Sequence, residues 1–294
     1  TQRNLAQLAA DGIHIMQPAE GDMACGEFGK GRMPEPPEIV AEINALLAAG
    51  PGRPRGFLTD TTHTINAPDL SRANLFGRHV LVTAGPTHEP IDPVRFIGNR
   101  SSGRMGIALA AAAAKRGAEV TLVAANVALP APAGVRRVDV RTASELAAAA
   151  EAEFANAHVL LMAAAPADFR VSDPAAGKLQ RSGSLELSLE PTEDILAGLA
   201  SQRRQGQTVV GFAAEHGGEA VERARGKLRR KGADLIVLND VSDPEIGFES
   251  ERNAVTLIGA ETETEVAIDS KDAVAEAILD EVARLREKQS QPAG

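Results

Sequence analysis

The chain has 294 residues, of which 44% are hydrophobic and 24% are charged, and this balance is typical of a globular protein rather than a disordered one. The formal net charge of −9 at pH 7 argues against duplex nucleic acid as the main partner, and the lack of Trp and Tyr argues against stacking platforms for single strands. No apolar run approaches the ~18 residues of a membrane helix, no secretory leader is visible, and a single cysteine forms no internal disulfide, so we expect a cytoplasmic protein.

The first 76 residues are expected to form two small segments. Residues 1–50 contain helix candidates at 3–10 and 37–49 on either side of a glycine-rich loop, and they are too few to fold alone. Residues 51–76 are rich in Pro, Arg, Thr and Asn without apolar periodicity, which predicts a linker. Cys25, the single thiol, lies in the glycine-rich loop, which indicates an accessible side chain rather than a buried one.

Residues 77–290 alternate between strand and helix patterns and are expected to form one domain. Apolar or alternating runs predict strands at 79–85, 118–124, 158–165, 185–191, 208–215 and 233–240, and NAVTLIG with TEVAID predicts a late antiparallel hairpin. Helix patterns, with Ser144 and Thr192 as starts and Gly232 as a stop, cover 104–118, 144–157, 192–206, 219–232 and 272–288. This order predicts an α/β fold with a doubly wound, mostly parallel, Rossmann-like sheet and helices on both faces.

Ligands of such sheets bind outside the carboxyl ends of the strands, so the residues that follow each predicted strand are candidates for a site. Asn99 follows the first strand, Asp168 follows the 158–165 strand, Phe212 lies near the end of the 208–215 strand, and Asn239 ends the 233–240 strand. Small and polar residues also terminate strands for structural reasons alone, so the set is stronger evidence than any one position.

The segment from Gly98 to Gly106 leads into a helix, and the free backbone N–H groups at its start favour an anion near Ser101, Ser102 and Gly103. The segment matches neither the GxxxxGK[ST] phosphate loop nor the GxGxxG dinucleotide turn. The 118–124 strand is followed by no carboxylate for a ribose hydroxyl, which disfavours a nicotinamide-dependent oxidoreductase. A glycine-rich helix start without a ligand is the structural alternative.

Charged residues indicate how a nucleotide would be held. Lys227 and Lys231 are spaced i, i+4 on one helix face, which suits a triphosphate, although a solvated helix end explains the same pattern. Asp168 suits Mg²⁺ or a nucleotide hydrogen bond, or else it caps a turn. Residues 172–184, which include Lys178, form either a lid over the site or an ordinary exposed loop.

A set of ordered sequence blocks carries a family resemblance. The blocks, spread over residues 78–288, are LVTAGPTHEPIDPVRFIGNRSSGRMG, AAAPADFR, GKLQRSG, PTEDILAGL, VVGFAAE, KLRRKGADLIVLNDVS and GFESERNAVTLI. They resemble the ligase half of the bacterial bifunctional coenzyme A biosynthesis protein family, which joins a phosphopantothenoylcysteine decarboxylase to a phosphopantothenate–cysteine ligase. Upstream, NLAQLAADGIHIMQPAEGDMACGEFGKGRMPEPPEI is similar to the end of the decarboxylase half.

The resemblance implies a reaction in two steps. The ligase activates the carboxylate of 4′-phosphopantothenate with CTP and Mg²⁺, which gives an acyl-cytidylate and pyrophosphate. The amine of L-cysteine then attacks, which releases CMP and forms 4′-phosphopantothenoylcysteine. Such chemistry depends on positioning and on neutralising phosphate charge.

The resemblance also implies roles for particular residues. Asn99 positions the acyl group, and Lys178 stabilises phosphate charge when its loop closes. Gln180 and Arg181 stand where the family often has further lysines, so the contacts at this loop differ from the family pattern. Asp168 is a candidate for Mg²⁺. The implied CTP contacts are Met162, Ala163, Ala164, Asp168, Lys178, Glu193, Asp194, Ile195, Leu196, Phe212, Lys227 and Lys231.

In the decarboxylase half, Cys25 matches the family's proton donor. The flavin-binding part and the upstream histidine are not in this chain, so we expect FMN and decarboxylase activity only in a full-length protein. The family's ligase is a dimer, with residues 172–188 as the expected exchange arm, and the decarboxylase half adds larger oligomers. A nicotinamide oxidoreductase and a non-catalytic nucleotide-binding module are the alternatives.

Overall fold

The computed structural model describes residues 74–181, 183–215, 219–240 and 252–290, with short stretches between residues 15 and 42. The chain divides into two units, Thr1–Arg72 and Ala73–Gly294. In the first unit, β1 (Ala19–Asp22) and β2 (Phe28–Arg32) pair antiparallel. Cys25 and nearly all of the two N-terminal helix candidates lie outside the described residues, and the expected division at residues 50 and 76 stays a prediction.

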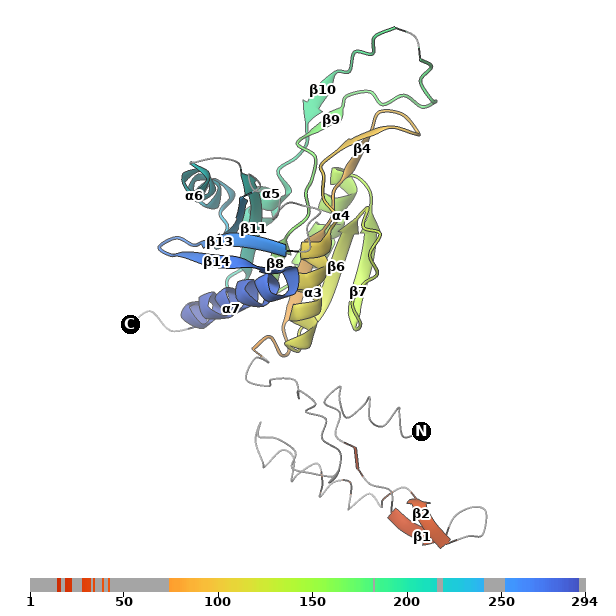
Figure 1. Ribbon diagram of the computed structural model, residues 1–294, viewed down its shortest axis with the longest axis vertical. Helices are drawn as coiled ribbons and strands as arrows, with labels where there is room; N and C mark the ends of the chain where they lie inside the picture. Colours follow the sequence, from red (N-terminus) through yellow and green to blue (C-terminus); the bar gives the residue numbers. More distant parts are fainter. Residues whose placement is uncertain are drawn as a thin grey trace. The chain divides into compact units, whose positions relative to one another are not determined.

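The second unit is built on an eight-stranded sheet (Figure 1). Its strands are, in spatial order, β14 (Glu263–Ser270), β13 (Arg252–Ile258), β12 (Leu235–Asp240), β11 (Thr208–Glu215), β8 (Val159–Met162), β3 (His79–Ala84), β6 (Glu119–Ala125) and β7 (Val135–Val140). Pairing is parallel from β12 to β7 and antiparallel between β12, β13 and β14. The predicted mostly parallel sheet with a late antiparallel hairpin is confirmed.

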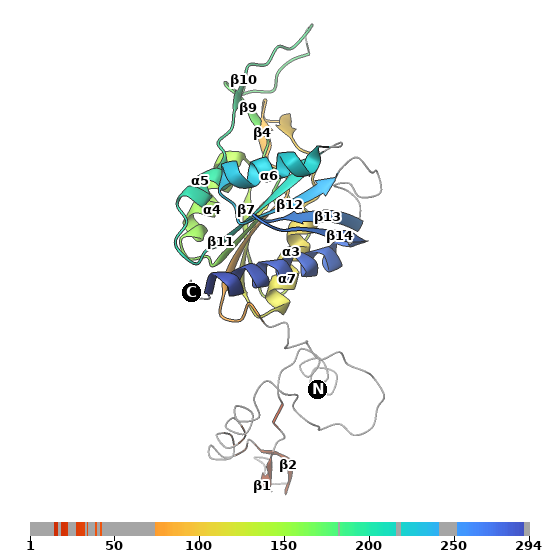
Figure 2. The same ribbon diagram turned by 90° about the vertical axis from the view of Figure 1, so that its left-hand side faces the viewer.

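Helices cover both faces of this sheet, as predicted (Figure 2). On one face, α3 (Arg104–Lys115) packs beside α7 (Lys271–Ser290). On the other lie α4 (Ala143–Phe154), α5 (Ile195–Ser201) and α6 (Ala220–Lys231). None of the described helices is long and apolar enough to cross a membrane.

The inner strands contain continuous apolar runs because both of their faces are covered. In β3, Val80, Leu81 and Val82 are all fully buried. Val80 and Val82 pack with the residues of α3 and α7, whereas Leu81 packs with those of α4 and α5. A continuous apolar run in the sequence therefore marks a central strand here, rather than a buried helix.

Three of the predicted element starts are corrected by the structure. Thr142, not Ser144, caps α4, because the Thr142 hydroxyl accepts a hydrogen bond from the Glu145 N–H at 3.2 Å. The Asp194 carboxylate caps α5 in the same way, so this helix begins after Asp194 rather than at Thr192. The strand predicted at 185–191 is confirmed only over 189–191, because its partner strand has three residues.

Two short hairpins project from the sheet beyond the carboxyl ends of the parallel strands (Figures 1 and 2). One pairs β4 (His88–Pro90) with β5 (Phe96–Gly98), and the other pairs β9 (Phe169–Val171) with β10 (Leu189–Pro191). The sequence did not predict β4, β5, β9 or the edge strand β7. The first three have only three residues each, which is too short for a period of two to be recognised.

Candidate functional site

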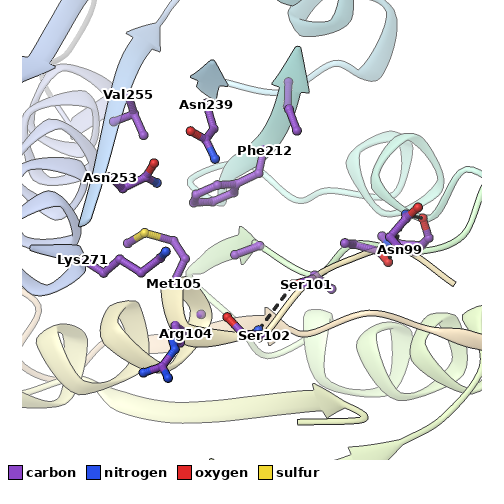
Figure 3. A pocket seen from close by; sticks show the side chains of 18 of the residues that line it. Asn99, Ser101, Ser102, Arg104, Met105, Phe212, Asn239, Asn253, Val255 and Lys271 are labelled. Atoms are coloured by element: carbon purple, nitrogen blue, oxygen red, sulfur yellow. Dashed lines mark hydrogen bonds between the residues drawn. The ribbon is translucent and has the colours of Figure 1, made fainter. Parts of the chain in front are cut away.

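A pocket of about 240 Å³ opens at the carboxyl end of the sheet, beside the point where β3 and β8 separate. From β3 the chain continues to β6 and β7 on one side of the sheet, and from β8 it continues to β11 and β12 on the other side. Open α/β sheets bind ligands at such a switch point. The pocket is lined by the following residues, most of which Figure 3 draws: Asn99, Ser101, Ser102, Gly103, Arg104, Met105, Gly106, Ala163, Ala164, Ala165, Pro166, Asp168, Phe212, Ala213, Ala214, Lys227, Asn239, Asn253, Val255 and Lys271.

Close packing fixes the start of α3 at one wall of the pocket. A Cβ on Gly106 would lie 2.4 Å from the Ala84 Cβ, so only glycine lets the helix approach β3 this closely. Gly103, which precedes the helix, has a φ of 73°, and a Cβ there would lie 2.6 Å from a Val127 methyl group. These glycines therefore shape the wall that carries the predicted anion-binding loop.

The loop after β8 forms the opposite wall and is held by buried hydroxyl groups. The Thr83 and Thr87 hydroxyls accept hydrogen bonds from the N–H groups of Ala164 at 3.1 Å and Ala167 at 2.9 Å. Both threonines are fully buried. Because the loop backbone is bonded to β3 and to the residues after it, Ala163 and Ala164 present a defined edge to the pocket.

Asn99 joins the two walls. Its side-chain amide donates to the carbonyl oxygen of Pro166 at 2.8 Å and, more weakly, to that of Ala165 at 3.4 Å. The predicted site residues Asn99, Ala164 and Asp168 thus line one pocket, although Asn99 is distant in sequence from the other two. Figure 3 shows Asn99 and Lys271 at opposite ends.

The pocket is richer in cations than in carboxylates. Among the described lining residues, Arg104, Lys227 and Lys271 are cationic and Asp168 is the one acid. Lys227 contacts Glu215 at 2.7 Å. Burial by itself raises the pKa of Glu215, but hydrogen bonds from Lys227 and Arg223, together with their charges, lower this pKa below its ordinary value. Glu215 therefore stays ionised and fixes the Lys227 ammonium at the rim.

Several lining residues were not predicted as site residues. Met105, Asn253, Val255 and Lys271 come from the helix start, the late hairpin and the last helix, and no strand-end rule points to them. Asn239 was noted at the end of its strand, and its side-chain oxygen is buried without a hydrogen-bond donor among the described residues. A bound ligand with an N–H or O–H group would satisfy this oxygen.

Other predicted residues lie away from the pocket lining. Met162 is buried in β8, and the Ile195 and Leu196 side chains pack in the core beneath α5. Lys231 forms an ion pair with Asp194, which joins α6 to the start of α5. Glu193 and Lys178 are exposed and do not line the pocket. The expected CTP set is thus divided: Ala163, Ala164, Asp168, Phe212 and Lys227 line the pocket, whereas the other members lie in the core, at the α5–α6 surface or on the Lys178 loop.

The loop that carries Lys178 is tied to the first hairpin by Asp92. Both Asp92 oxygens are used: one accepts from the N–H groups of Val94 and Arg95, and the other from the Arg95 guanidinium at 2.8 Å and the Leu179 N–H at 3.2 Å. Burial favours the neutral carboxyl group, but these hydrogen bonds and the Arg95 charge prevail and lower the pKa of Asp92. An ionised carboxylate thus fixes the residue next to Lys178.

Comparison with known proteins gives a consistent result. A family model described as the DNA/pantothenate metabolism flavoprotein C-terminal domain matches residues 75–285. The coenzyme A biosynthesis bifunctional protein CoaBC of Escherichia coli K12 is 41% identical over 286 residues, which are 96% of this chain and 65% of that protein. A prokaryotic protein named cysteine/cysteine sulfinic acid decarboxylase is 44% identical over 260 residues, 88% of this chain and 67% of that protein. The chain spans about two thirds of the length of these relatives.

Solved structures show the same fold. The C-terminal domain of a coenzyme A biosynthesis bifunctional protein CoaBC is 36% identical, has a TM-score of 0.63, and covers 74% of this chain and 99% of that domain. A Cab2 variant in complex with phosphopantothenate-cysteine has a TM-score of 0.62 and covers 87% of this chain and 96% of its own, but at 17% identity it supports the fold alone.

Proposed function

The chain belongs to the family of the DNA/pantothenate metabolism flavoprotein C-terminal domain, and we propose that it joins 4′-phosphopantothenate to L-cysteine in coenzyme A biosynthesis. CTP is the proposed activating nucleotide. The substrate carboxylate attacks the α-phosphate of CTP and pyrophosphate leaves; the cysteine amine then attacks the acyl carbon of the acyl-cytidylate and CMP leaves. The supporting relatives carry this pathway in their names.

The observation that carries the proposal is the charge and shape of the pocket. Its described lining offers cations and backbone N–H groups at a helix start, which suit phosphates, and it contains no histidine or cysteine. A ligation that proceeds through an acyl-cytidylate, a mixed anhydride, needs alignment and charge neutralisation more than a general base. The pocket supplies these two requirements.

Magnesium is part of the proposal. The described residues contain no group of three or more candidate ligands for a resident ion. Mg²⁺ commonly binds to one or two carboxylates while substrate phosphates and water complete its shell, and Asp168 at the pocket suits this mode. Asp168 would hold the ion, which would neutralise phosphate charge when it is bound with the nucleotide.

Individual residues have proposed roles in this reaction. Asn99 orients the acyl group, because its amide lies at the junction of the two pocket walls. Ala163 and Ala164 present backbone groups to the nucleotide, and Lys227 contacts a phosphate. Lys178 acts from its loop, which must move toward the pocket because the lysine does not line it.

A second copy of the chain is the proposed partner. The projecting hairpins carry exposed apolar side chains that a monomer leaves in water: Val94, Phe96, Phe169, Leu185, Leu187 and Leu189. A symmetric dimer formed through these hairpins would cover the exposed apolar side chains and bring a second polypeptide near the mouth of the pocket. Light scattering that gives twice the chain mass is the expected result, and a monomer at micromolar concentration would contradict it.

Decarboxylation is a separate proposal for a longer protein, together with FMN and larger oligomers. Cys25 is its proposed proton donor. The name of the 44%-identical relative refers to a decarboxylase, but this chain spans about two thirds of that protein. We propose that the 294 residues alone carry the ligase activity and act in the cytoplasm.

A product assay tests the proposed function. The full chain with 4′-phosphopantothenate, cysteine, CTP and Mg²⁺ is expected to form 4′-phosphopantothenoylcysteine and CMP in equal amounts, measured by mass spectrometry. Lys178→Met should abolish turnover, whereas Lys115→Met, at an exposed position on α3, should not. A folded wild-type chain that binds CTP without forming product would favour a non-catalytic module; binding of NADH in preference to CTP would favour an oxidoreductase.

A further inference from the structure

Lys271 is a buried cation in the pocket. It is the first residue of α7, it is 8% exposed, and it lines the pocket. In Figure 3 its side chain runs into the pocket. Neither the strand-end pattern nor the family resemblance assigned it a role.

Burial and a nearby cation both act on the charge of Lys271. Burial lowers its pKa, and the charge of Arg104 lowers it further. An anion bound next to Lys271 would reduce both the desolvation cost and the repulsion.

We propose that Lys271 binds the β,γ-pyrophosphoryl end of the nucleotide and stabilises pyrophosphate as it leaves, a role that rests on the proposed ligase function. In an in-line displacement, the attacking and leaving oxygens lie on opposite sides of the phosphorus atom. Asn99 marks the end that holds the acyl group, and Lys271 lies at the opposite end. The leaving group is therefore directed toward Lys271.

The bonds made and broken define what Lys271 does. A carboxylate oxygen of 4′-phosphopantothenate forms a bond to the α-phosphorus of CTP, and the bond from that phosphorus to the bridging oxygen breaks. The electron pair stays on this oxygen and leaves with pyrophosphate. Lys271 transfers no proton; its ammonium neutralises the charge that develops on the leaving group.

Calorimetry with separate parts of the nucleotide tests this assignment. The probes are CMP, inorganic pyrophosphate and CTP, each with Mg²⁺ and the full chain. Lys271→Met keeps the length of the buried stem and removes the charge. We expect pyrophosphate and CTP to bind about 10- to 100-fold more weakly, as for a lost charge-assisted hydrogen bond, and CMP to bind within about twofold of wild type.

Two further variants keep the test decisive if the methionine variant folds poorly. Lys271→Arg retains the charge and should restore most pyrophosphate binding, and Lys115→Met removes an exposed lysine of α3 as a matched control. Unchanged pyrophosphate binding in folded Lys271→Met, or an equal loss for CMP, would overturn the assignment. So would an effect confined to the KM for cysteine, which would assign Lys271 to the cysteine carboxylate. Pyrophosphate binding without any ligation by the wild-type chain would contradict the proposed function instead.

Discussion

At the scale of single residues, polar side chains organise the pocket through specific contacts. The Asn99 amide bridges the loop before α3 and the loop after β8, and Glu215 holds Lys227 at the rim. The sequence could indicate Asn99 and Lys227, since both lie in recognisable blocks. It could not indicate Lys271 or Asn253, because their place in the pocket depends on how the last helix and the late hairpin fold back on the sheet.

Asn99→Asp should reduce turnover by about 100-fold or more, comparable to the loss of one oriented donor in an active site. The new carboxylate would face the Pro166 carbonyl oxygen, which accepts from Asn99 at 2.8 Å in the native chain. The affinity for CTP should change by less than about threefold, because the proposed role of Asn99 is to orient the acyl group and not to contact the nucleotide. Steady-state rates and calorimetry measure these two effects. Asn156→Asp, at an exposed position, is the control, and equal rates for the two variants would contradict the role of Asn99.

At the scale of elements, the close packing of helix α3 against strand β3 depends on a glycine at the point of contact. Gly106→Ala should lower the free energy of unfolding by about 1–3 kcal/mol, because the new methyl group meets Ala84 and overpacks the interface. Gly198→Ala in α5 is the matched control: its Cβ meets nothing within 4 Å, so the better helix former should stabilise by about 0.5–1 kcal/mol. Urea denaturation measures both changes, and equal signs would refute the packing argument.

The loop that carries Lys178 should loosen in Asp92→Asn. An asparagine oxygen can still accept from the Val94 and Arg95 N–H groups, but its amide would face the Leu179 N–H and the Arg95 guanidinium. We expect the Leu179 amide to exchange with solvent about tenfold faster, measured by hydrogen–deuterium exchange. Asp139→Asn, at an exposed strand position, should leave this exchange unchanged. If the Leu179 amide of Asp92→Asn exchanged at the wild-type rate, contacts other than those of Asp92 would hold the loop.

Elements were predicted well wherever several turns or a long apolar run defined them. The strand at 208–215 has the predicted bounds, and α6 ends at Gly232, whose φ of 63° suits the left-handed position after a helix. The three-residue strands β4, β5 and β9 were not predicted because they form only by pairing with a neighbouring strand. Ser144 was predicted as the cap of α4 because several residues near the helix start can serve as a cap, and it is the Thr142 hydroxyl that makes the capping hydrogen bond.

At the scale of the whole molecule, His158 links strands at the amino end of the sheet. Its Nδ1 accepts from the His79 N–H at 2.9 Å. Burial lowers the pKa of His158, and the charges of Arg78 and Arg286 lower it further. The unfolded chain therefore binds a proton near pH 6.5 that the folded chain takes up only at lower pH, so stability is complete above pH 6.5 and falls as the pH drops below it.

His158→Asn should flatten this pH dependence, because asparagine retains an acceptor near the Nδ1 position and does not titrate. Thermal denaturation between pH 7.5 and 5.5 measures the slope for wild type and variant. His88, whose pKa is also lowered by burial and then by Arg141, should preserve part of the decline. A variant with the full wild-type slope would show that His158 does not contribute.

The most direct test of the proposed activity is pyrophosphate release from the full chain with 4′-phosphopantothenate and Mg²⁺, compared between CTP and ATP, before and after cysteine is added. We predict a burst of about one equivalent with CTP before cysteine, which reports the acyl-cytidylate, and continuous release once cysteine is present. A preference for ATP would retain the ligase and contradict the choice of nucleotide. No release with either nucleotide, from folded protein that binds CTP, would contradict the ligase itself.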